Sequence, residues 1–155
     1  MENTGDYIIR DITREDIPEV LKMEMLSFSD PWTEIIFLDI FRNQHAFLGV
    51  FDSGKLIAFL VAFYGLDHVH LANLAVAPVA RCKGIGKLLL EHVKELTLQA
   101  RLKIIILEVR ISNLAAIHLY QKMNFTSVGS LPEYYEDKED AVVFYWVYGS
   151  ESLGC

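Results

Sequence analysis

The sequence predicts an α+β (mixed α/β) fold, in which helices flank one central sheet. Short apolar runs rich in β-branched residues, such as residues 104–109, are typical of strands. Longer segments with apolar residues at helical spacing, such as the one that ends near Arg101, indicate amphipathic helices. The two kinds are interspersed without a repeat or linker, so residues 1–155 most simply form a single domain, with a core at about residues 7–148.

The first half of the chain is predicted to hold a strand, two helices and a β-hairpin. Thr13 is a plausible N-cap of the first helix, and residues 30–33 (Asp-Pro-Trp-Thr) end that helix and begin the second. The turn sequence Asp-Ser-Gly-Lys at residues 52–55 joins the two strands of the hairpin. The expected bounds are residues 7–12 for the strand, 13–28 and 33–43 for the helices, and 46–52 and 56–64 for the hairpin.

The second half is predicted to hold two further helices and four strands. One strand ends at Val76, and a glycine loop leads from it into the helix that ends near Arg101. Asn113 is a plausible N-cap of the next helix, and Asn124 suits the left-handed turn at its end. The expected bounds are residues 104–109 for a strand, 113–123 for the helix, and 126–135 and 141–148 for the last two strands.

The composition excludes several classes of function. The formal net charge is −7, whereas nonspecific nucleic-acid binding needs a basic surface, so we expect no nucleic-acid partner. No apolar run is long enough to cross a membrane and the polar N-terminus lacks a secretory signal, so we expect a cytoplasmic protein with no membrane partner. Cys82 and Cys155 suit neither a structural disulfide nor a zinc site. His68 and His70 alternate on one strand without a suitably spaced acidic or cysteine partner, so we expect no metal.

The segment Arg81-Cys82-Lys83-Gly84-Ile85-Gly86-Lys87 carries the first functional signal, because a strand precedes it and a helix follows. Glycines let the backbone approach a bound group, and a helix start offers unpaired N–H groups and a partial positive charge. Both features suit a phosphate or pyrophosphate, although an ordinary tight turn has the same pattern. Leu89 stands where a dinucleotide-binding GxGxxG needs glycine, and Leu88 stands where a Walker loop needs Ser or Thr.

The segments around this loop are more specific. Leu-Ala-Val-Ala-Pro precedes it at residues 74–78, and Leu-Glu-Val-Arg follows at residues 107–110, ahead of Asn113, Ala116, Leu119-Tyr120 and Phe125. This pattern resembles the GCN5-related N-acetyltransferase (GNAT) superfamily over about residues 8–147. Pro31-Trp32-Thr33-Glu34, and Tyr134-Tyr135 followed by Glu139-Asp140-Ala141, are similar to its RimI type, the ribosomal-protein-alanine N-acetyltransferases. The resemblance implies a central mixed, mostly antiparallel sheet and acetyl-coenzyme A (acetyl-CoA) as cosubstrate.

Glu108 and Tyr120 are the catalytic candidates. Strand alternation turns Glu108 to the face of Ile104 and Ile106, where apolar neighbours favour a carboxylate that takes up a proton. An exposed glutamate at a strand end is the alternative. Tyr120 shares a helix face with Asn113 and apolar residues, so a core aromatic residue is the alternative there. The resemblance implies that Glu108 accepts the proton of the amine, directly or through water, and that Tyr120 donates one to the coenzyme A sulfur.

The resemblance also implies the residues that bind acetyl-CoA. It assigns the pyrophosphate to the backbone of the loop, while Arg81, Lys83 and Lys87 supply charge, and the family often has a basic residue where this chain has Cys82. It assigns the pantetheine arm to Asn113, which would also cap its helix, and to the edge of the strand that ends at Val76, before the glycine loop. In the family this strand and a parallel neighbour splay apart. The full cofactor-binding set is Leu74, Ala75, Val76, Arg81, Cys82, Lys83, Gly84, Ile85, Gly86, Lys87 and Asn113.

An N-terminal α-amine suits a single glutamate base better than a lysine does. An α-amine has a pKa of about 8 and lysine one of about 10.4, so about a tenth of the former but only about one in 2,500 of the latter is neutral at pH 7. The RimI resemblance implies the same kind of acceptor, the N-terminal alanine of a small-subunit ribosomal protein, with Trp32, Tyr134 and Tyr135 against the substrate. The two tyrosines suit packing equally well. A lysine, a small-molecule amine and a noncatalytic acetyl-CoA-binding module are the other functions left open.

Overall fold

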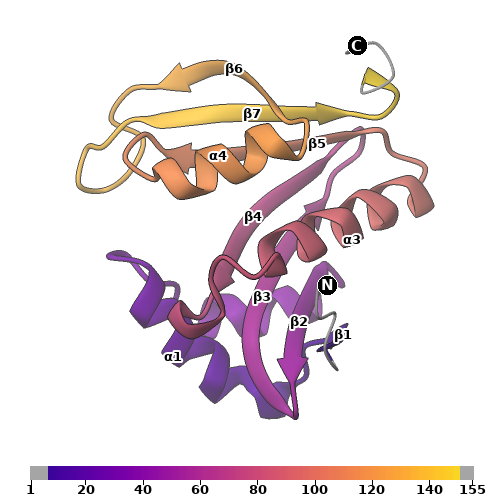
Figure 1. Ribbon diagram of the computed structural model, residues 1–155, viewed down its shortest axis with the longest axis vertical. Helices are drawn as coiled ribbons and strands as arrows, with labels where there is room; N and C mark the ends of the chain where they lie inside the picture. Colours follow the sequence, from indigo (N-terminus) through magenta and orange to yellow (C-terminus); the bar gives the residue numbers. More distant parts are fainter. Residues whose placement is uncertain (1–6, 151–155) are drawn as a thin grey trace. The chain divides into compact units, whose positions relative to one another are not determined.

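The computed structural model describes residues 7–150. This part of the chain forms four α-helices and seven strands, and Figure 1 shows their arrangement. They are β1 (Tyr7–Asp11), α1 (Ile17–Ser27), α2 (Glu34–Arg42), β2 (Ala46–Asp52), β3 (Lys55–Tyr64), β4 (Val69–Val76), α3 (Ile85–Gln99), β5 (Ile104–Arg110), α4 (Leu114–Lys122), β6 (Thr126–Leu131) and β7 (Ala141–Val147). None of the helices within residues 7–150 combines the length and apolarity that a membrane span requires.

The strands are hydrogen-bonded in the order β1-β2-β3-β4-β5-β7-β6. The pairs β1·β2, β2·β3, β5·β7 and β6·β7 are antiparallel, and β4·β5 is parallel. The predicted mixed, mostly antiparallel sheet is therefore confirmed. By its contacts the described chain forms two compact units: residues 7–63 with Asn73–Leu89, and Tyr64–Ala72 with residues 90–150. Both β4 and α3 have their first and last residues in different units.

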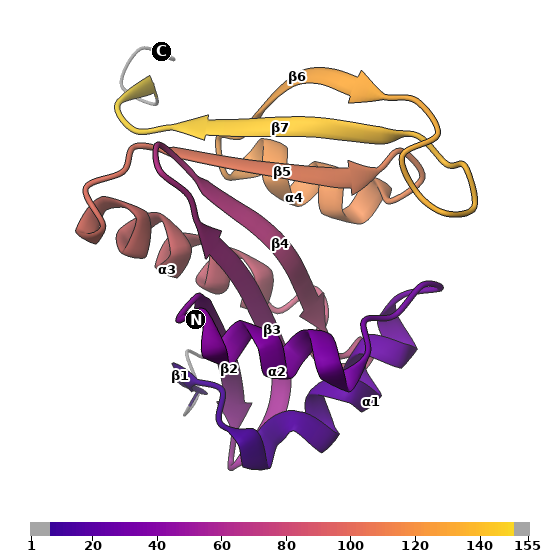
Figure 2. The same cartoon turned by 180° about the vertical axis from the view of Figure 1, so that it is seen from behind.

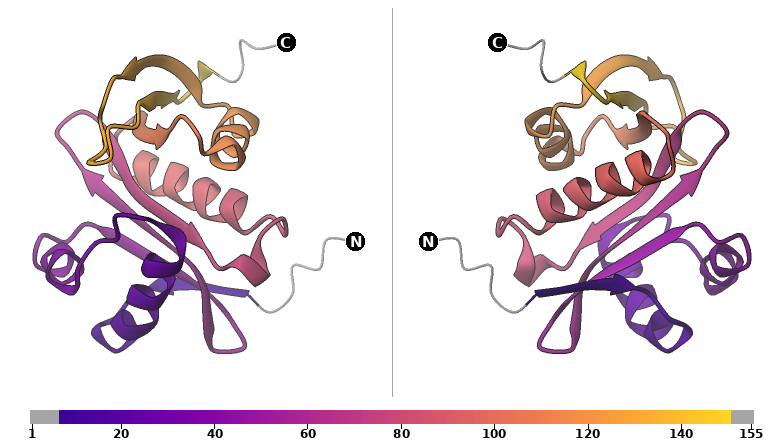
Figure 3. Two further views of the ribbon diagram at one scale, coloured as in Figure 1. Left: turned by 90° about the vertical axis from the view of Figure 1, so that its left-hand side faces the viewer. Right: turned by 90° about the vertical axis from the view of Figure 1, so that its right-hand side faces the viewer.

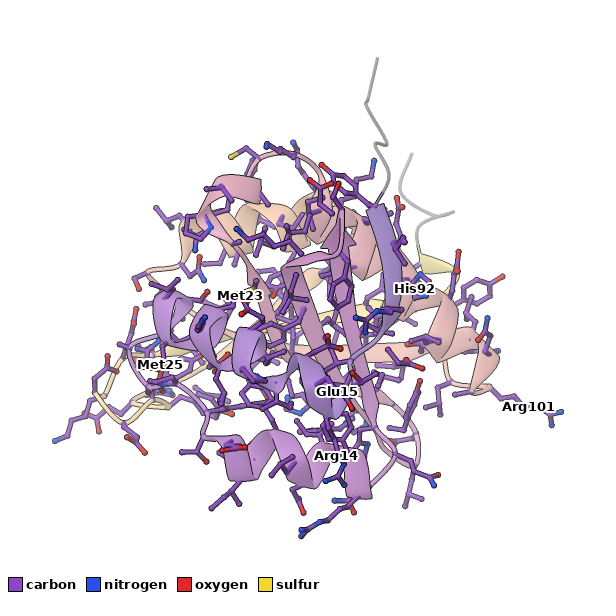
Figure 4. The ribbon with its side chains drawn as sticks, turned by 90° about the horizontal axis from the view of Figure 1, so that it is seen from below. Arg14, Glu15, Met23, Met25, His92 and Arg101 are labelled. Atoms are coloured by element: carbon purple, nitrogen blue, oxygen red, sulfur yellow. The ribbon has the colours of Figure 1, made fainter. Side chains whose placement is uncertain are left out.

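In the first unit, α1 and α2 cover β2 and β3. Figure 2 shows α2 crossing in front of the two strands, and both helices lie on the same side of them in Figure 3. Phe37 of α2 is fully buried, with its ring 5.6 Å from that of Phe47 in β2 and 5.8 Å from that of Phe59 in β3. Two methionines of α1, labelled in Figure 4, lie on opposite sides of the helix: Met23 is buried in the core and Met25 is exposed. These aromatic and aliphatic contacts form the core of the unit.

The local signals at the ends of these elements act as predicted, with one difference. Thr13 begins a helical segment, but the first turn is a 3₁₀ turn (Arg14–Asp16), in which Asp16 accepts from the Thr13 N–H at 2.8 Å. Ser53 and Gly54, with φ angles of 51° and 82°, give the hairpin of β2 and β3 the double left-handed conformation of a tight turn.

In the second unit, β5, β7 and β6 form an antiparallel sheet and α4 lies along one face of it (Figures 1 and 2). Asn113 caps α4 by accepting from the Ala116 N–H at 3.2 Å, and Asn124 takes the predicted left-handed conformation. The prediction that β6 extends to residue 135 is wrong. β6 ends at Leu131, because Pro132 lacks the N–H that the ladder needs, and Glu133 follows with a φ of 51°.

Candidate active site

The glycine loop belongs to the first unit and has the backbone of an anion-binding turn. Cys82 and Gly84 both have positive φ angles, 62° and 79°, and α3 begins at Ile85 immediately afterwards. The Leu88 N–H donates back to the Gly84 carbonyl at 3.0 Å. The N–H groups before Leu88 belong to the first turn of α3, where a helix supplies no carbonyl to accept from them. A Cβ added at Gly84 would meet nothing within 4 Å, so the loop is open on this side. This geometry fits a pyrophosphate.

The charged residues of the loop have different surroundings. Arg81 is exposed, and its Nε donates to the carbonyl of Val76 at 3.1 Å, which ties the loop to the end of β4. Lys83 and Lys87 are exposed on either side of Gly84. Cys82 is an exposed free thiol. Ile85 is buried and anchors the start of α3 in the core, so its side chain is structural, and a binding role for its backbone N–H stays a prediction.

The predicted pantetheine-binding strand edge is the last part of β4. Ala75 is buried, Leu74 and Val76 are half-buried, and the N–H of the following Ala77 donates to Ile57 of β3 at 2.8 Å. The register of β4 on β5 pairs Val69 with Ile105 and His70 with Ile106. These observations fix the position of the strand, and the binding role of residues 74–76 stays a prediction, as does the splaying of the two parallel strands.

Glu108 belongs to the second unit and is paired with a histidine. It lies on the same face of β5 as Ile104 and Ile106, as predicted, with a side chain 20% exposed. Its Oε2 is 2.6 Å from Nε2 of His70 in β4. An ionised carboxylate only accepts hydrogen bonds, so His70 is the donor in this state. The apolar residues of this face are not the only neighbours of Glu108, because the parallel pairing of β4 and β5 also brings the imidazole of His70 to its carboxylate.

Tyr120 lies on the buried side of α4. Its ring is 5.7 Å from that of Phe125 and 6.0 Å from that of Phe144, so the core-aromatic interpretation describes its ring correctly. Burial raises the pKa of its hydroxyl, and the nearby Tyr135 adds to this effect. A tyrosine in this environment keeps its proton at neutral pH and remains a potential donor. Asn113 lies at the start of the same helix, where its side chain is the N-cap, and its contact with acetyl-CoA stays a prediction.

The Tyr134–Tyr135 loop also belongs to the second unit and is held by Arg110, two residues after Glu108 on the same strand. Nη1 of Arg110 contacts Asp137 at 2.8 Å and Glu139 at 2.8 Å, and its guanidinium carbon lies 4.1 Å from the centroid of the Tyr135 ring. The rings of Tyr134 and Tyr135 meet edge to face at 5.0 Å. Partial burial raises the pKa of Tyr134, and the negative charge of Glu108 contributes to the rise. Tyr134, Tyr135 and Glu108 therefore share one region of this unit.

Trp32, the third predicted substrate residue, belongs to the first unit. It is half-buried, and its ring is 5.6 Å from that of Phe37. Its backbone N–H donates to Oε1 of Glu24 at 3.0 Å. Glu24 is 1% exposed on α1, and its other oxygen accepts from the side-chain amide of Asn73 in β4 at 2.8 Å.

Sequence reasoning missed Glu24, and it named His70 and Arg110 without the contacts described above. The signal for Glu24 was available, because it falls on the same helix face as Ile17 and Val20, where a carboxylate breaks the apolar pattern. His70 had no local signal, since its partner is 38 positions away. For metal binding, residues 7–150 contain no cluster of three or more His, Cys, Asp or Glu side chains in a suitable arrangement.

Comparison with known proteins gives one consistent result. The acetyltransferase (GNAT) family model matches residues 9–125. The putative [ribosomal protein bS18]-alanine N-acetyltransferase of Bacillus subtilis is 30% identical over 141 residues, covering 90% of this chain and 93% of that protein. The crystal structure of the ribosomal-protein-S18-alanine N-acetyltransferase from Escherichia coli has a TM-score of 0.83 at 30% identity, covering 91% and 93% of the two chains. Ard1 from Thermoplasma volcanium has a TM-score of 0.88 at 26% identity, covering 92% and 98%.

Proposed function

Because the chain belongs to the acetyltransferase (GNAT) family and is an N-acetyltransferase, we propose that it transfers the acetyl group of acetyl-CoA to the N-terminal α-amine of a protein. The observation that carries this proposal is Glu108, a partly buried carboxylate on β5 that His70 contacts at 2.6 Å. The same strand holds the Tyr134–Tyr135 loop through Arg110. One carboxylate base suits an amine that loses its proton readily.

In the proposed reaction Glu108 accepts a proton from the ammonium form of the acceptor, directly or through water. The neutral nitrogen attacks the thioester carbonyl carbon and a C–N bond forms. The C–S bond then breaks, and the nitrogen, which is now positively charged, loses its second proton to solvent to give the neutral amide. The departing thiolate takes a proton from the Tyr120 hydroxyl, whose raised pKa keeps it protonated until that moment. The Tyr120 phenolate regains a proton from solvent, and Glu108 releases its proton in the same way. Acid–base help of this kind supplies about 10²- to 10⁴-fold in rate.

The acetyl donor is proposed to be held mainly by backbone groups. The N–H groups at Gly84–Lys87 lie at the N-terminus of α3, where the helix dipole favours a pyrophosphate, and Lys83 and Lys87 add positive charge. The edge of β4 at Leu74–Val76 offers amides to the pantetheine arm, and Asn113 is its second predicted contact. Backbone binding explains why Cys82, in place of a basic residue, leaves the predicted site intact.

The N-terminal alanine of a small-subunit ribosomal protein is the first acceptor to test. The Bacillus subtilis and Escherichia coli relatives that are named for this reaction are each 30% identical to this chain. An α-amine also has the lower pKa, so that one carboxylate base is sufficient. Trp32, Tyr134 and Tyr135 are proposed to contact the acceptor peptide. A ribosomal acceptor places the reaction in the cytoplasm.

Mass spectrometry of short peptides, incubated with the protein and acetyl-CoA, tests this function. The peptides are one with a free N-terminal alanine, the same peptide blocked at its N-terminus and carrying an internal lysine, and a set with other free N-terminal residues. Modification confined to free α-amines supports the proposal and ranks the residues. Modification of the blocked peptide moves the assignment to lysine, and no modification of any peptide contradicts protein acetylation.

A further inference from the structure

Glu24 spans two segments of the first unit with its two carboxylate oxygens. Oε1 accepts from the backbone N–H of Trp32 at 3.0 Å, and Oε2 accepts from Nδ2 of Asn73 at 2.8 Å. Trp32 lies just before α2, and Asn73 immediately precedes residues 74–76 of β4. One side chain thus connects the segment proposed to recognise the acceptor with the strand proposed to hold the acetyl donor.

Packing does not require a carboxylate at this position. Glu24 is 1% exposed and lies on the α1 face of Ile17 and Val20, which an apolar side chain of similar length would complete. Burial raises the pKa of Glu24, against the opposing effect of the hydrogen bonds from Trp32 and Asn73, and the negative charge of Asp30 adds to the rise. A buried carboxylate costs free energy that its hydrogen bonds only partly offset, whereas apolar replacements of buried ionic groups are often neutral or stabilising.

The two segments that Glu24 joins are anchored differently. β4 is held by its neighbours in the sheet, and the N–H of Ala77 at its end donates to Ile57 of β3. Residues 28–33 instead form the link between α1 and α2, outside any helix or strand, and Trp32 is held there by its N–H bond to Glu24 and its ring contact with Phe37. Loss of the carboxylate therefore displaces Trp32 rather than β4.

We propose that Glu24 is a positioning residue for the acceptor: it fixes the backbone of Trp32 relative to Asn73, and so sets where the acceptor peptide lies with respect to the strand that holds the acetyl donor. This inference rests on the proposed function for its substrate. The fixing of Trp32 is independent of substrate and has its own measurement.

Two substitutions separate positioning from packing. Glu24→Gln keeps the shape of the side chain and both hydrogen bonds. Its carbonyl accepts from the Trp32 N–H, and its NH₂ group donates to Oδ1 of Asn73 once the Asn73 amide has rotated by 180°. Glu24→Met keeps the length and apolar volume but removes both acceptors. Glu19→Met is the matched control on the exposed side of α1. Within residues 7–150, the one ion pair of Glu19 is with Lys22, at 3.4 Å.

Steady-state kinetics with an N-terminal alanine peptide give the first readout. Glu24→Met is expected to raise the peptide KM about tenfold, the order expected for loss of hydrogen bonds to a charged group, while the KM of acetyl-CoA stays unchanged. Glu24→Gln and Glu19→Met are expected to keep the wild-type peptide KM. If Glu24→Met does not fold, Asn73→Ala replaces it, with an expected rise of about threefold because one of the two hydrogen bonds is lost.

Fluorine NMR of 5-fluorotryptophan-labelled protein gives the second readout, which needs no turnover. The chain has 2 tryptophans, and Trp32→Phe identifies the Trp32 signal. Glu24→Met is expected to shift or broaden the Trp32 signal and leave that of Trp146 in place, while Glu24→Gln leaves both unchanged. An unmoved Trp32 signal in Glu24→Met, or a moved signal with a wild-type peptide KM, overturns the proposal. If the wild type acetylates no peptide, the proposed function fails, and the NMR result still decides whether Glu24 fixes Trp32.

Discussion

Nε2 of His70 and Oε2 of Glu108 lie 2.6 Å apart across the parallel pair of strands β4 and β5. Both side chains are partly exposed, at 34% and 20%, so the pair is within reach of solvent. An imidazole N–H that donates to one oxygen leaves the other oxygen of Glu108 available as a proton acceptor. The contact thus gives the proposed base a fixed orientation.

This orientation predicts a graded effect of changes at His70. His70→Ala is expected to lower kcat/KM about tenfold, because the carboxylate loses its donor and its fixed position. His70→Gln keeps a donor and is expected to stay within about threefold of the wild type. The measurement is kcat/KM with an N-terminal alanine peptide at saturating acetyl-CoA. Equal losses in both variants would contradict an orienting role and indicate that the ring itself transfers the proton.

Tyr120→Phe separates the chemistry of the hydroxyl from the packing of the ring. The ring contacts with Phe125 and Phe144 persist in this variant, so the melting temperature is expected to stay close to that of the wild type. The expected fall in kcat is about 10²-fold, because the thiolate loses its proton donor. Thermal unfolding, acetyl-CoA titration and kcat are measured on the same preparation. An unchanged kcat would leave Tyr120 as a core residue alone.

Arg110→Lys tests whether the Tyr134–Tyr135 loop recognises the acceptor. A lysine does not reproduce the planar contacts of Arg110 with Asp137, Glu139 and Tyr135, so the loop loses its fixed position. The peptide KM is expected to rise about fivefold, with a smaller change in kcat. Arg101→Lys is the matched control, since Arg101 extends away from the end of α3 into solvent (Figure 4). A peptide KM that is equal in both variants would exclude the loop from acceptor binding.

The ion pair of Asp16 with Arg10 is expected to make part of the free energy of unfolding depend on pH in the acid range. The Arg10 guanidinium, 2.7 Å away, lowers the pKa of Asp16 from 3.8 to about 2. Because the folded-state pKa is depressed, the stabilisation is complete above about pH 4 and is lost as the pH falls towards 2. The Arg10 side chain is 42% exposed, so screening limits the contribution to about 1 kcal/mol.

Urea unfolding of the wild type and of Asp16→Asn measures this term. The variant is expected to be less stable by about 1 kcal/mol at pH 7, and the difference is expected to shrink below pH 3. A difference that stays constant between pH 7 and pH 2.5 would show that the cap geometry of Thr13, rather than the charge, is responsible.

Features set by neighbouring residues in the chain could be predicted from the sequence. The hairpin turn at Ser53 and Gly54, the N-cap at Asn113 and the face of Glu108 all depend on residues within a few positions. The strand predicted for residues 126–135 ends at Leu131, where Pro132 interrupts the apolar and aromatic residues that continue to Tyr135. Proline should have ended the strand on physical grounds.

Features set by contacts between distant segments could not be predicted in the same way. The partner of His70 depends on the register of β4 against β5, and that register places His70 opposite Ile106. Arg110 reaches Asp137 and Glu139 only because β5 pairs with β7 along its whole length. Tertiary packing, rather than local sequence, decides which polar groups meet.

The most direct test of the account uses one peptide that carries both a free N-terminal alanine and an internal lysine. The peptide is incubated with acetyl-CoA and either the wild type or Glu108→Gln, and tandem mass spectrometry locates the acetyl group. We predict acetylation of the α-amine by the wild type and a rate lower by about 10²-fold or more for Glu108→Gln, which still binds acetyl-CoA. Acetylation of the lysine, or equal rates for the two proteins, would contradict the account.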